Sequence, residues 1–359
     1  MSILLLAALS ATAHAEDSAK AGDGDGSFPF RVGGATFEPS ALVQVWVTAY
    51  DMDEDKQADA SGYGDPEDDE GVKLKRARLG FSGGFKKWSY KLSVGTSAPY
   101  DGLSEPEEPI EVVDALVGVE PVNGLEIRVG QGKLPFSRDQ LISAGELTFT
   151  ERGIASEHLT PDRSLGLTVG YGRKGGKITV GAFNAGGDLF GDVAMGKTLV
   201  GRLEWDVGKA NTYKTWGDRK EFGLGVGANG YYTMGEATST WAVGGDAMLR
   251  GGGLSFLVDG VFSHIAPTET TVETPEVWEE TDRWGVTGQL GYQVNAFEPT
   301  VRVSMLNDST LGGYTQVLFG GAWHTAEDHA RVGLGYELRL EDQDAVDNDT
   351  LRLWAQFKL

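Results

Sequence analysis

The chain has 359 residues, no cysteine and a formal net charge of −22 at pH 7. The lack of cysteine excludes disulfide frameworks, thiolate metal sites and cysteine nucleophiles, and the acidic balance argues against nucleic acid as a partner. After residue 15 no stretch reaches the roughly 18–20 uninterrupted apolar residues that a membrane-spanning helix requires, so a helical membrane protein is excluded.

The first residues predict an export signal. Residues 1–15 combine an apolar run with the small-residue ending Ala11-Thr-Ala-His-Ala15, which is typical of a secretory signal peptide, although no Lys or Arg precedes the run. Residues 16–40, rich in Gly and Asp, predict a flexible lead-in. The strand pattern then continues to the end of the chain, so we interpret residues 41–359 as one outer-membrane β-barrel.

Sixteen segments alternate between apolar and polar residues and are bounded by turn residues, which predicts sixteen β-strands. They lie near residues 41–50, 72–83, 86–97, 110–120, 124–133, 163–172, 176–184, 197–207, 220–232, 239–250, 253–264, 281–294, 297–306, 313–324, 328–340 and 350–359.

The last strand shows the two faces most clearly. Leu351, Leu353 and Phe357 fall on one side, and Arg352 and Gln356 fall on the other. In a transmembrane barrel the apolar face meets lipid and the polar face lines a lumen. Aromatic residues recur near the expected strand ends and predict girdles at the membrane–water boundary: Tyr50, Trp205, Tyr231, Tyr232, Trp241, Trp284, Tyr292 and Tyr336.

The links between these strands alternate in length. Counting from the first strand, the odd links are long: 51–71, 98–109, 134–162, 185–196 and 265–280. Most even links are short and rich in Gly and Asn, as tight hairpins require. The segment 208–219 is a long even link, and 233–238 is a short odd one. This parity predicts long extracellular loops and short periplasmic turns, the habit of outer-membrane barrels.

Alternation also decides which charges face the lumen. Ala77, Leu79 and Phe81 share one face of their strand, and Arg76 and Arg78 share the other. A charge facing hydrocarbon at mid-membrane costs about 2–4 kcal/mol, so these guanidiniums must point inward or sit near an interface. The same reasoning turns further charged side chains inward: Arg128, Arg202, Arg302, Arg331, Arg352, Asp114, Glu126 and Glu204. Such an interior suits a small-solute pore; the alternative is a plug of salt bridges that conducts nothing.

Several segments together resemble the phosphate-selective porin O and P family. They are Arg76–Phe81, Trp88–Leu92, Arg128–Ser137, Leu147–Arg152, Asp162–Gly166, Gly181–Asn184 and the closing strand. The resemblance covers roughly residues 37–359 and is densest over 74–205. It implies an all-β fold: a sixteen-stranded antiparallel barrel, usually a homotrimer, whose third loop folds inward to narrow the pore.

By position, the resemblance implies that a set of charged residues lies on or beside that constriction: Lys133, Arg138, Glu146, Glu151, Arg152 and Arg163. A salt bridge that pins the loop to the wall is an equal alternative for Glu151 and Arg152. The phosphate-binding members carry lysines in the inward loop. This chain has no Lys or Arg between Asp139 and Thr150, so the family name by itself does not assign phosphate as the preferred anion.

We therefore predict a passive outer-membrane porin for small hydrophilic solutes or inorganic anions, embedded in outer-membrane lipid and without a cofactor. The alternative is a structural or adhesive barrel without an open pore. We predict no enzyme, because His158, His264, His324 and His329 form no recognisable catalytic or zinc-binding pattern. The acidic lead-in lacks the glycine and closing glutamate of a calcium loop, so we predict no metal site.

Overall fold

The computed structural model describes residues 29–50, 71–96, 110–185, 196–217, 220–235, 238–267, 280–325, 329–342 and 349–359. The expected signal peptide and most residues of the long links 51–71, 98–109, 185–196 and 265–280 lie outside these ranges. Within them, no helix has the length and apolarity to cross a membrane.

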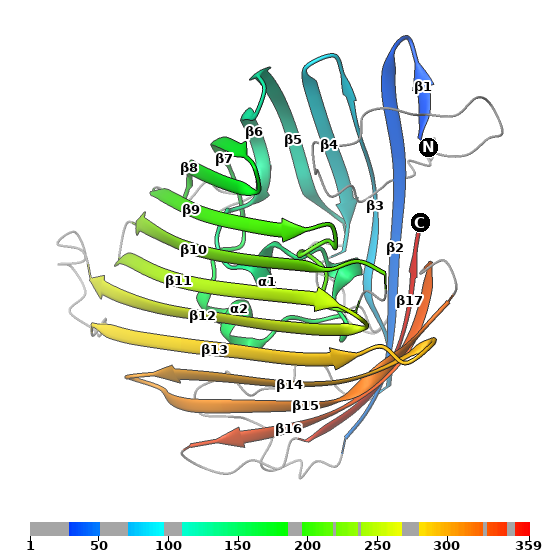
Figure 1. The fold of residues 1–359 in the computed structure, drawn as a ribbon. Coiled ribbons are helices and arrows are strands. Elements are labelled where there is room, and N and C mark those ends of the chain that lie inside the picture. Colours follow the sequence, from blue (N-terminus) through cyan, green and yellow to red (C-terminus); the bar gives the residue numbers. More distant parts are fainter. Residues whose placement is uncertain are drawn as a thin grey trace, which may run out of the picture.

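Sixteen antiparallel strands form a closed ring (Figure 1). They are β2 (Ala35–Tyr50), β3 (Gly71–Phe85), β4 (Trp88–Gly95), β5 (Glu111–Val122), β6 (Leu125–Lys133), β7 (Arg163–Arg173), β8 (Gly176–Asn184), β9 (Lys197–Gly208), β10 (Gly223–Met234), β11 (Thr238–Gly251), β12 (Leu254–Pro267), β13 (Thr281–Tyr292), β14 (Phe297–Asp308), β15 (Gly312–His324), β16 (Ala330–Glu341) and β17 (Thr350–Lys358). Each pairs with the next along the chain, and β17 pairs with β2, which closes the barrel.

The predicted all-β class and strand number are confirmed. The largest difference in bounds is at β2, which begins at Ala35 rather than at residue 41. A short additional strand, β1 (Phe30–Val32), pairs with the start of β2. Residues 30–40, assigned from the sequence to the lead-in, are therefore mostly strand.

Tight hairpins join most neighbouring strands at one end of the barrel, which we call the turn end; the opposite end is the loop end. At the turn end, Lys174 and Gly175 join β7 to β8 with φ values of 53° and 84°. Two successive residues with positive φ make a turn whose twist matches that of the strands it joins.

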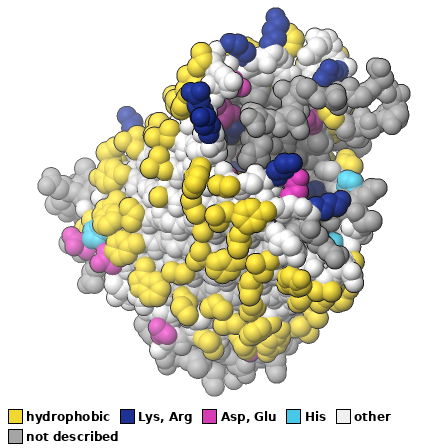
Figure 2. Space-filling view, in the orientation of Figure 1, with side chains coloured by type: hydrophobic (Ala, Val, Ile, Leu, Met, Phe, Trp, Pro, Cys, Tyr) yellow, Lys and Arg dark blue, Asp and Glu magenta, His cyan; other side chains and the backbone are white. Residues whose placement is uncertain are grey.

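The strands show the predicted alternation of faces. On β17, Leu351, Leu353 and Phe357 are exposed on the outer surface, whereas Trp354 and Gln356 are buried inside the barrel. Hydrophobic side chains gather over the face formed by the strands drawn in front in Figure 1 (Figure 2). Apolar residues turned outward and polar residues turned inward are what a barrel in lipid requires.

The aromatic residues follow the same alternation. Trp205, Tyr232, Trp241, Trp284, Tyr292 and Tyr336 are exposed on the outer surface, as a girdle requires. The prediction for Tyr231 was wrong: its ring packs inside the barrel, 4.9 Å from the ring of Phe136. Adjacent residues of a strand point to opposite faces, so Tyr231 and Tyr232 cannot both face lipid.

A bulge alters the face pattern on β3. Gln44 pairs with Arg76 and Val45 pairs with Leu74, which leaves Lys75 as the extra residue. Both Lys75 and Arg76 are buried inside the barrel. A bulge therefore brings two consecutive cations to the lumen, where strict alternation would have sent one of them to lipid.

Candidate pore constriction

The link between β6 and β7, residues 134–162, lies inside the barrel (Figure 1). It carries the short helix α1 (Arg138–Leu141), the 3₁₀ turn η2 (Ala144–Glu146) and the helix α2 (Ile154–Leu159). We call this segment the inward loop. It is the third long link, the one that the family resemblance implies to fold inward.

An apolar cluster holds the inward loop against the wall. Leu134, Phe136, Ile154 and Leu159 of the loop pack with inward-facing residues of the strands: Phe183, Val200, Ala242, Val261, Leu306 and Tyr314. Apolar side chains facing a water-filled lumen would be unfavourable, and the loop removes them from water. This part of the interior is therefore a packed core and not a channel.

Hydrogen bonds tie the backbone of the loop to distant strands. The indole Nε1 of Trp46 on β2 donates to Thr150 Oγ1 at 2.9 Å. Arg302 Nη1 on β14 donates to the carbonyl of Glu151 at 2.7 Å, and Arg76 Nη1 on β3 donates to the carbonyl of Thr150 at 2.6 Å. The loop apex is thus anchored on both sides of the barrel, and its position is fixed.

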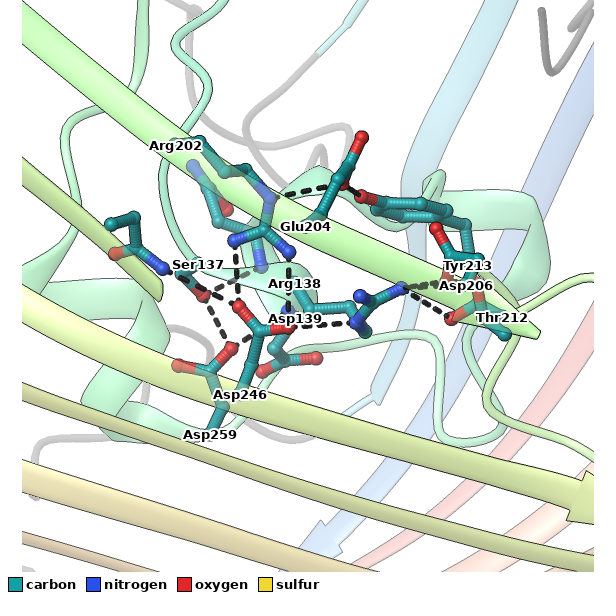
Figure 3. Close-up of polar contacts among 12 residues, drawn as sticks. Ser137, Arg138, Asp139, Arg202, Glu204, Asp206, Thr212, Tyr213, Asp246 and Asp259 are labelled. Atoms are coloured by element: carbon teal, nitrogen blue, oxygen red, sulfur yellow. Dashed lines mark hydrogen bonds and ion pairs between the residues drawn. The ribbon is translucent and has the colours of Figure 1, made fainter. Parts of the chain in front are cut away.

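Arg138 lies at the centre of a buried ion-pair network (Figure 3). Its Nε is 2.7 Å from Asp246 Oδ1 on β11, and its Nη1 is 3.3 Å from Asp206 Oδ1 on β9. Arg202 on β9 also pairs with Asp246, at 2.6 Å, and with Glu204, at 3.1 Å. These contacts hold Arg138 and Arg202 against the wall and satisfy their charges.

Glu151 neutralises cations of the neighbouring wall. It pairs with Lys75 at 2.5 Å and with Arg352 at 3.5 Å, and Arg76 is 3.9 Å away. Burial alone would raise the pKa of this carboxyl, but Lys75, and then Arg352 and Arg76, lower the pKa to about 2. Glu151 therefore makes the contacts of the alternative stated above, in which a salt bridge pins the loop to the wall.

Arg152 and Lys133 instead bind the inward loop to itself. Arg152 donates from Nε to the carbonyl of Asp139 at 3.0 Å and from Nη2 to that of Ile142 at 2.7 Å. Lys133 Nζ donates to the carbonyls of Gln140 and Ile142. Both cations therefore stabilise the turn of the loop around α1.

Glu146 at the loop apex meets the turn end of the barrel. It pairs with Lys358 near the chain end and with Lys214, at 3.5 Å, in the link between β9 and β10. Burial would raise the pKa of Glu146, but Lys214 and Lys358 lower it below its usual range. Glu146 is therefore paired with two cations.

The wall from β3 to β8 differs because five of its inward cations retain contact with water. Lys91, Arg128 and Lys177 have side-chain exposures of 33%, 32% and 35%. Arg163 is 18% exposed, and Arg78 on β3 is also partly exposed. A solute in the lumen could reach these five cations directly.

Few carboxylates balance that wall. Asp114 pairs with both Lys91, at 2.9 Å, and Arg163, at 3.1 Å. Glu126 is shared by Arg128, at 2.6 Å, and Lys177, at 3.9 Å. The Nε atom of Arg78 is buried without a hydrogen-bond partner among the described residues. We call the five cations Arg78, Lys91, Arg128, Arg163 and Lys177 the cationic wall.

The structure thus separates the predicted site residues into two groups. Arg76, Lys133, Arg138, Glu146, Glu151, Arg152 and Arg202 have their polar groups engaged in contacts that hold the loop and wall together. Arg78, Arg128 and Arg163 belong to the cationic wall. Sequence reasoning missed Lys91 and Lys177. Strict alternation on β4 would have placed Lys91 inward, on the face opposite to its apolar neighbours Tyr90 and Leu92.

A comparison with protein families supports this assignment of the fold. The family model of phosphate-selective porin O and P matches residues 50–222, which confirms the resemblance predicted from the sequence. A comparison with curated proteins finds no match. The matched residues include β3–β9 and the inward loop, and so the whole cationic wall.

Solved structures of outer-membrane proteins share the barrel. An anion-selective porin from Comamonas acidovorans is 11% identical with a TM-score of 0.63, over 90% of this chain and 99% of that one. The channel DcaP of Acinetobacter baumannii is 12% identical with a TM-score of 0.60, over 92% and 99%. The trimer form of OmpT of Vibrio cholerae is 12% identical with a TM-score of 0.60, over 91% and 100%. These similarities confirm the fold, a closed barrel of sixteen antiparallel strands.

Proposed function

We propose that this outer-membrane porin conducts small hydrophilic solutes by passive diffusion and prefers anions. The observation that carries the anion preference is the cationic wall, because its side chains Lys91, Arg128 and Lys177 are each about one third exposed. Glu146 and Glu151 of the inward loop are instead paired with cations, so the charge of these two carboxylates is largely cancelled.

The charge balance of the wall supports this preference. The five cations have three carboxylates as ion-pair partners, those of Asp114, Glu126 and Asp162, so the wall carries an excess of positive charge. Arg78 also lies close to the cations Arg76, Arg152 and Arg163. Fixed charges of one sign in a low-dielectric constriction raise the local concentration of the opposite ion. A small inorganic anion is the solute that such a wall favours.

The remaining features of the proposal follow from the same fold. Residues 1–15 would direct export and be removed, and the apolar outer face would contact outer-membrane lipid. The trimer form of OmpT supports a homotrimer for this chain. Diffusion past fixed charges needs neither a cofactor nor a catalytic step.

The test is the zero-current potential of the purified protein in a planar bilayer under a potassium chloride gradient. We expect an anion-selective potential in the wild type. The double variant Arg78→Gln, Arg163→Gln should shift this potential toward cation selectivity, because it removes two charges of the wall. The matched control is Lys174→Asn, which removes a charge at an exposed turn whose positive φ asparagine tolerates.

The outcomes distinguish the two candidate functions. An unchanged potential in the double variant would contradict the role of the cationic wall. A cation-selective wild type would contradict the anion preference but leave the porin intact. Correctly folded protein that forms no channel would support the structural barrel instead.

A further inference from the structure

The link between β9 and β10 is unlike the other links at the turn end. The hairpins on either side of it, at Lys174–Gly175 and Gly252–Gly253, are tight turns, whereas this link extends from Lys209 to Phe222. The sequence marks it as the long even link. The described residues 209–217, which we call the turn-end segment, fold into the lumen.

Arg250 on β11 binds the turn-end segment through three carbonyl groups. Its Nε donates to Trp216 at 2.6 Å, its Nη1 to Asn211 at 2.6 Å and its Nη2 to Gly217 at 3.2 Å. A guanidinium offers five donors in a rigid fork, so it can fix several carbonyls of a folded-back segment at once. Arg250 therefore holds this segment inside the barrel.

Strands farther around the ring hold the same segment. The backbone N–H of Gly217 donates to Glu298 Oε1 on β14 at 2.9 Å. The ring of Trp216 lies 4.8 Å from the ring of His324 on β15, and the guanidinium of Arg331 on β16 lies 5.3 Å from the Trp216 ring. The segment thus leaves β9 and crosses the turn end as far as β16.

The turn-end segment also meets the apex of the inward loop. Thr215 N donates to the carbonyl of Glu146 at 3.0 Å, Thr148 N donates to Thr215 Oγ1 at 2.8 Å, and Thr148 Oγ1 donates to the carbonyl of Thr215 at 2.9 Å. Lys214 pairs with Glu146 at 3.5 Å. Two segments that enter the lumen from opposite ends are therefore joined within it.

We propose that the turn-end segment is a second constriction element, which closes the β11–β16 side of the lumen and confines solutes to the side of β3–β9. Behind it, Arg250, Ser255 and Arg331 are only 2%, 2% and 1% exposed. On the opposite side, Arg128 and Lys177 at the turn end remain about one third exposed. The hydrogen bond from the Tyr213 hydroxyl to Glu204 on β9 marks the edge between the closed and open sides.

This inference rests on the proposed porin function and deepens it, because it assigns the route that solutes take past the cationic wall. Solutes would leave the lumen between the turn-end segment and the starts of β6 and β8. The aperture at that end is then off-centre, and Glu126, Arg128, Lys177 and Glu204 contribute its charges.

The absence of native cysteine allows a direct test by single-cysteine labelling. Thr179 lies on the open side, because it is partly exposed and shares the inward face of β8 with Lys177, whereas Ser255 lies behind the turn-end segment. We expect an anionic methanethiosulfonate reagent to modify Thr179→Cys and reduce its current. The Ser255→Cys variant should react at least about tenfold more slowly, because the segment covers it. Equal labelling rates would overturn the proposal.

A second variant tests the segment itself. Residues 209–222 are replaced by Asn-Gly, the sequence that joins β5 to β6 at Asn123-Gly124 and suits a two-residue hairpin. We expect single-channel conductance to rise about twofold or more, and Ser255→Cys in this background to become reactive. Unchanged conductance in a folded variant would contradict the proposal.

The two parts of the experiment separate this inference from the proposed function. Labelling is measured by mass as well as by current, so it reports the covered and open sides even if the wild type forms no channel. A silent wild type would count against the porin function alone. A conducting wild type with equal labelling at both cysteines would count against the second constriction alone. If the shortened variant does not fold, the labelling rates of Thr179→Cys and Ser255→Cys in the full-length chain still test the second constriction.

Discussion

The guanidinium of Arg138 and the carboxylate of Asp246 form an ion pair at 2.7 Å in which neither side chain has any exposed surface. One residue belongs to the inward loop and the other to the middle of β11, so the pair joins the loop to the wall. A charge buried this deeply is tolerated only when it is paired, because desolvation of an unpaired ion is very costly. The pair therefore acts as an anchor of the loop.

Removal of this anchor should destabilise the protein strongly. We expect Arg138→Gln to lower the free energy of unfolding by about 3 kcal/mol, because Asp246 loses one of its two buried cations. Urea titration of the detergent-solubilised protein measures the change. The matched control Arg128→Gln breaks a partly exposed pair with Glu126 and should cost less than about 1 kcal/mol. Equal losses in the two variants would contradict the anchoring role.

The same anchor requires a glycine at position 225. A Cβ atom at Gly225 would lie 2.3 Å from Asp206 Oδ1 and 2.7 Å from Arg138 Nη1. We therefore expect Gly225→Ala to displace one of these groups and to cost about 1–3 kcal/mol, the usual penalty of overpacking. Gly288→Ala is the control, since a Cβ there has no neighbour within 4 Å. The midpoint of thermal unfolding in detergent compares the two variants. An unchanged midpoint in Gly225→Ala would argue against a rigid network around Arg138.

Glu151 should make stability depend on pH. Its pKa falls from the ordinary 4.5 to about 2, because Lys75 and Arg352 outweigh the effect of burial. A lowered folded-state pKa stabilises the folded protein above pH 4.5, and this contribution disappears as the pH falls from 4.5 toward 2. It amounts to about 3 kcal/mol at neutral pH.

The comparison of Glu151→Gln with the wild type isolates this contribution. The amide does not titrate, so the variant should be clearly less stable than the wild type at about pH 6, and this difference in stability should fall to less than about half at about pH 3. Thermal unfolding of both proteins at the two pH values gives the difference. A gap between the two proteins that stays constant with pH would show that Glu151 is not the titrating group.

Trp46 should contribute through its indole N–H as well as through its ring. The Arg352 guanidinium and the Lys75 Nζ lie over the ring, 3.8 Å and 4.2 Å from its centroid. The indole Nε1 donates a hydrogen bond to Thr150 Oγ1. Trp46→Phe keeps an aromatic face but removes the donor, so we expect a loss of about 1 kcal/mol or more. Trp205→Phe on the lipid face is the control and should change the free energy of unfolding little. A larger loss in Trp205→Phe than in Trp46→Phe would contradict the anchoring role of Trp46.

The strand pattern was predictable because its cause is local. The period of two places Leu353 outward and Arg352 inward whatever the rest of the chain does, and lipid outside the barrel enforces that choice. Sixteen strands, their approximate bounds and the inward direction of Arg76, Arg128 and Arg202 followed from this rule. The rule failed where the backbone departs from it, as at the β3 bulge that turns Lys75 inward.

The roles of the inward charges were not predictable in the same way. Arg138 and Arg163 carried the same expectation from the sequence, yet one is fully buried against Asp246 and the other faces water beside Asp114. Nothing local distinguishes them, because Asp246 becomes a neighbour of Arg138 only when the loop enters the closed barrel. The unusual length of the link that contains the turn-end segment was visible in the sequence. The sequence did not show that this segment folds into the lumen.

The sequence by itself therefore determined the membrane barrel and the face on which each strand residue lies, since these depend on periodicity and on the cost of placing charge in lipid. The tertiary structure alone decided which half of the lumen is filled and which cations stay exposed on the cationic wall. Those outcomes depend on contacts between residues far apart in the chain. A buried charge needs an oppositely charged partner to offset its desolvation free energy, and only the folded barrel brings that partner close.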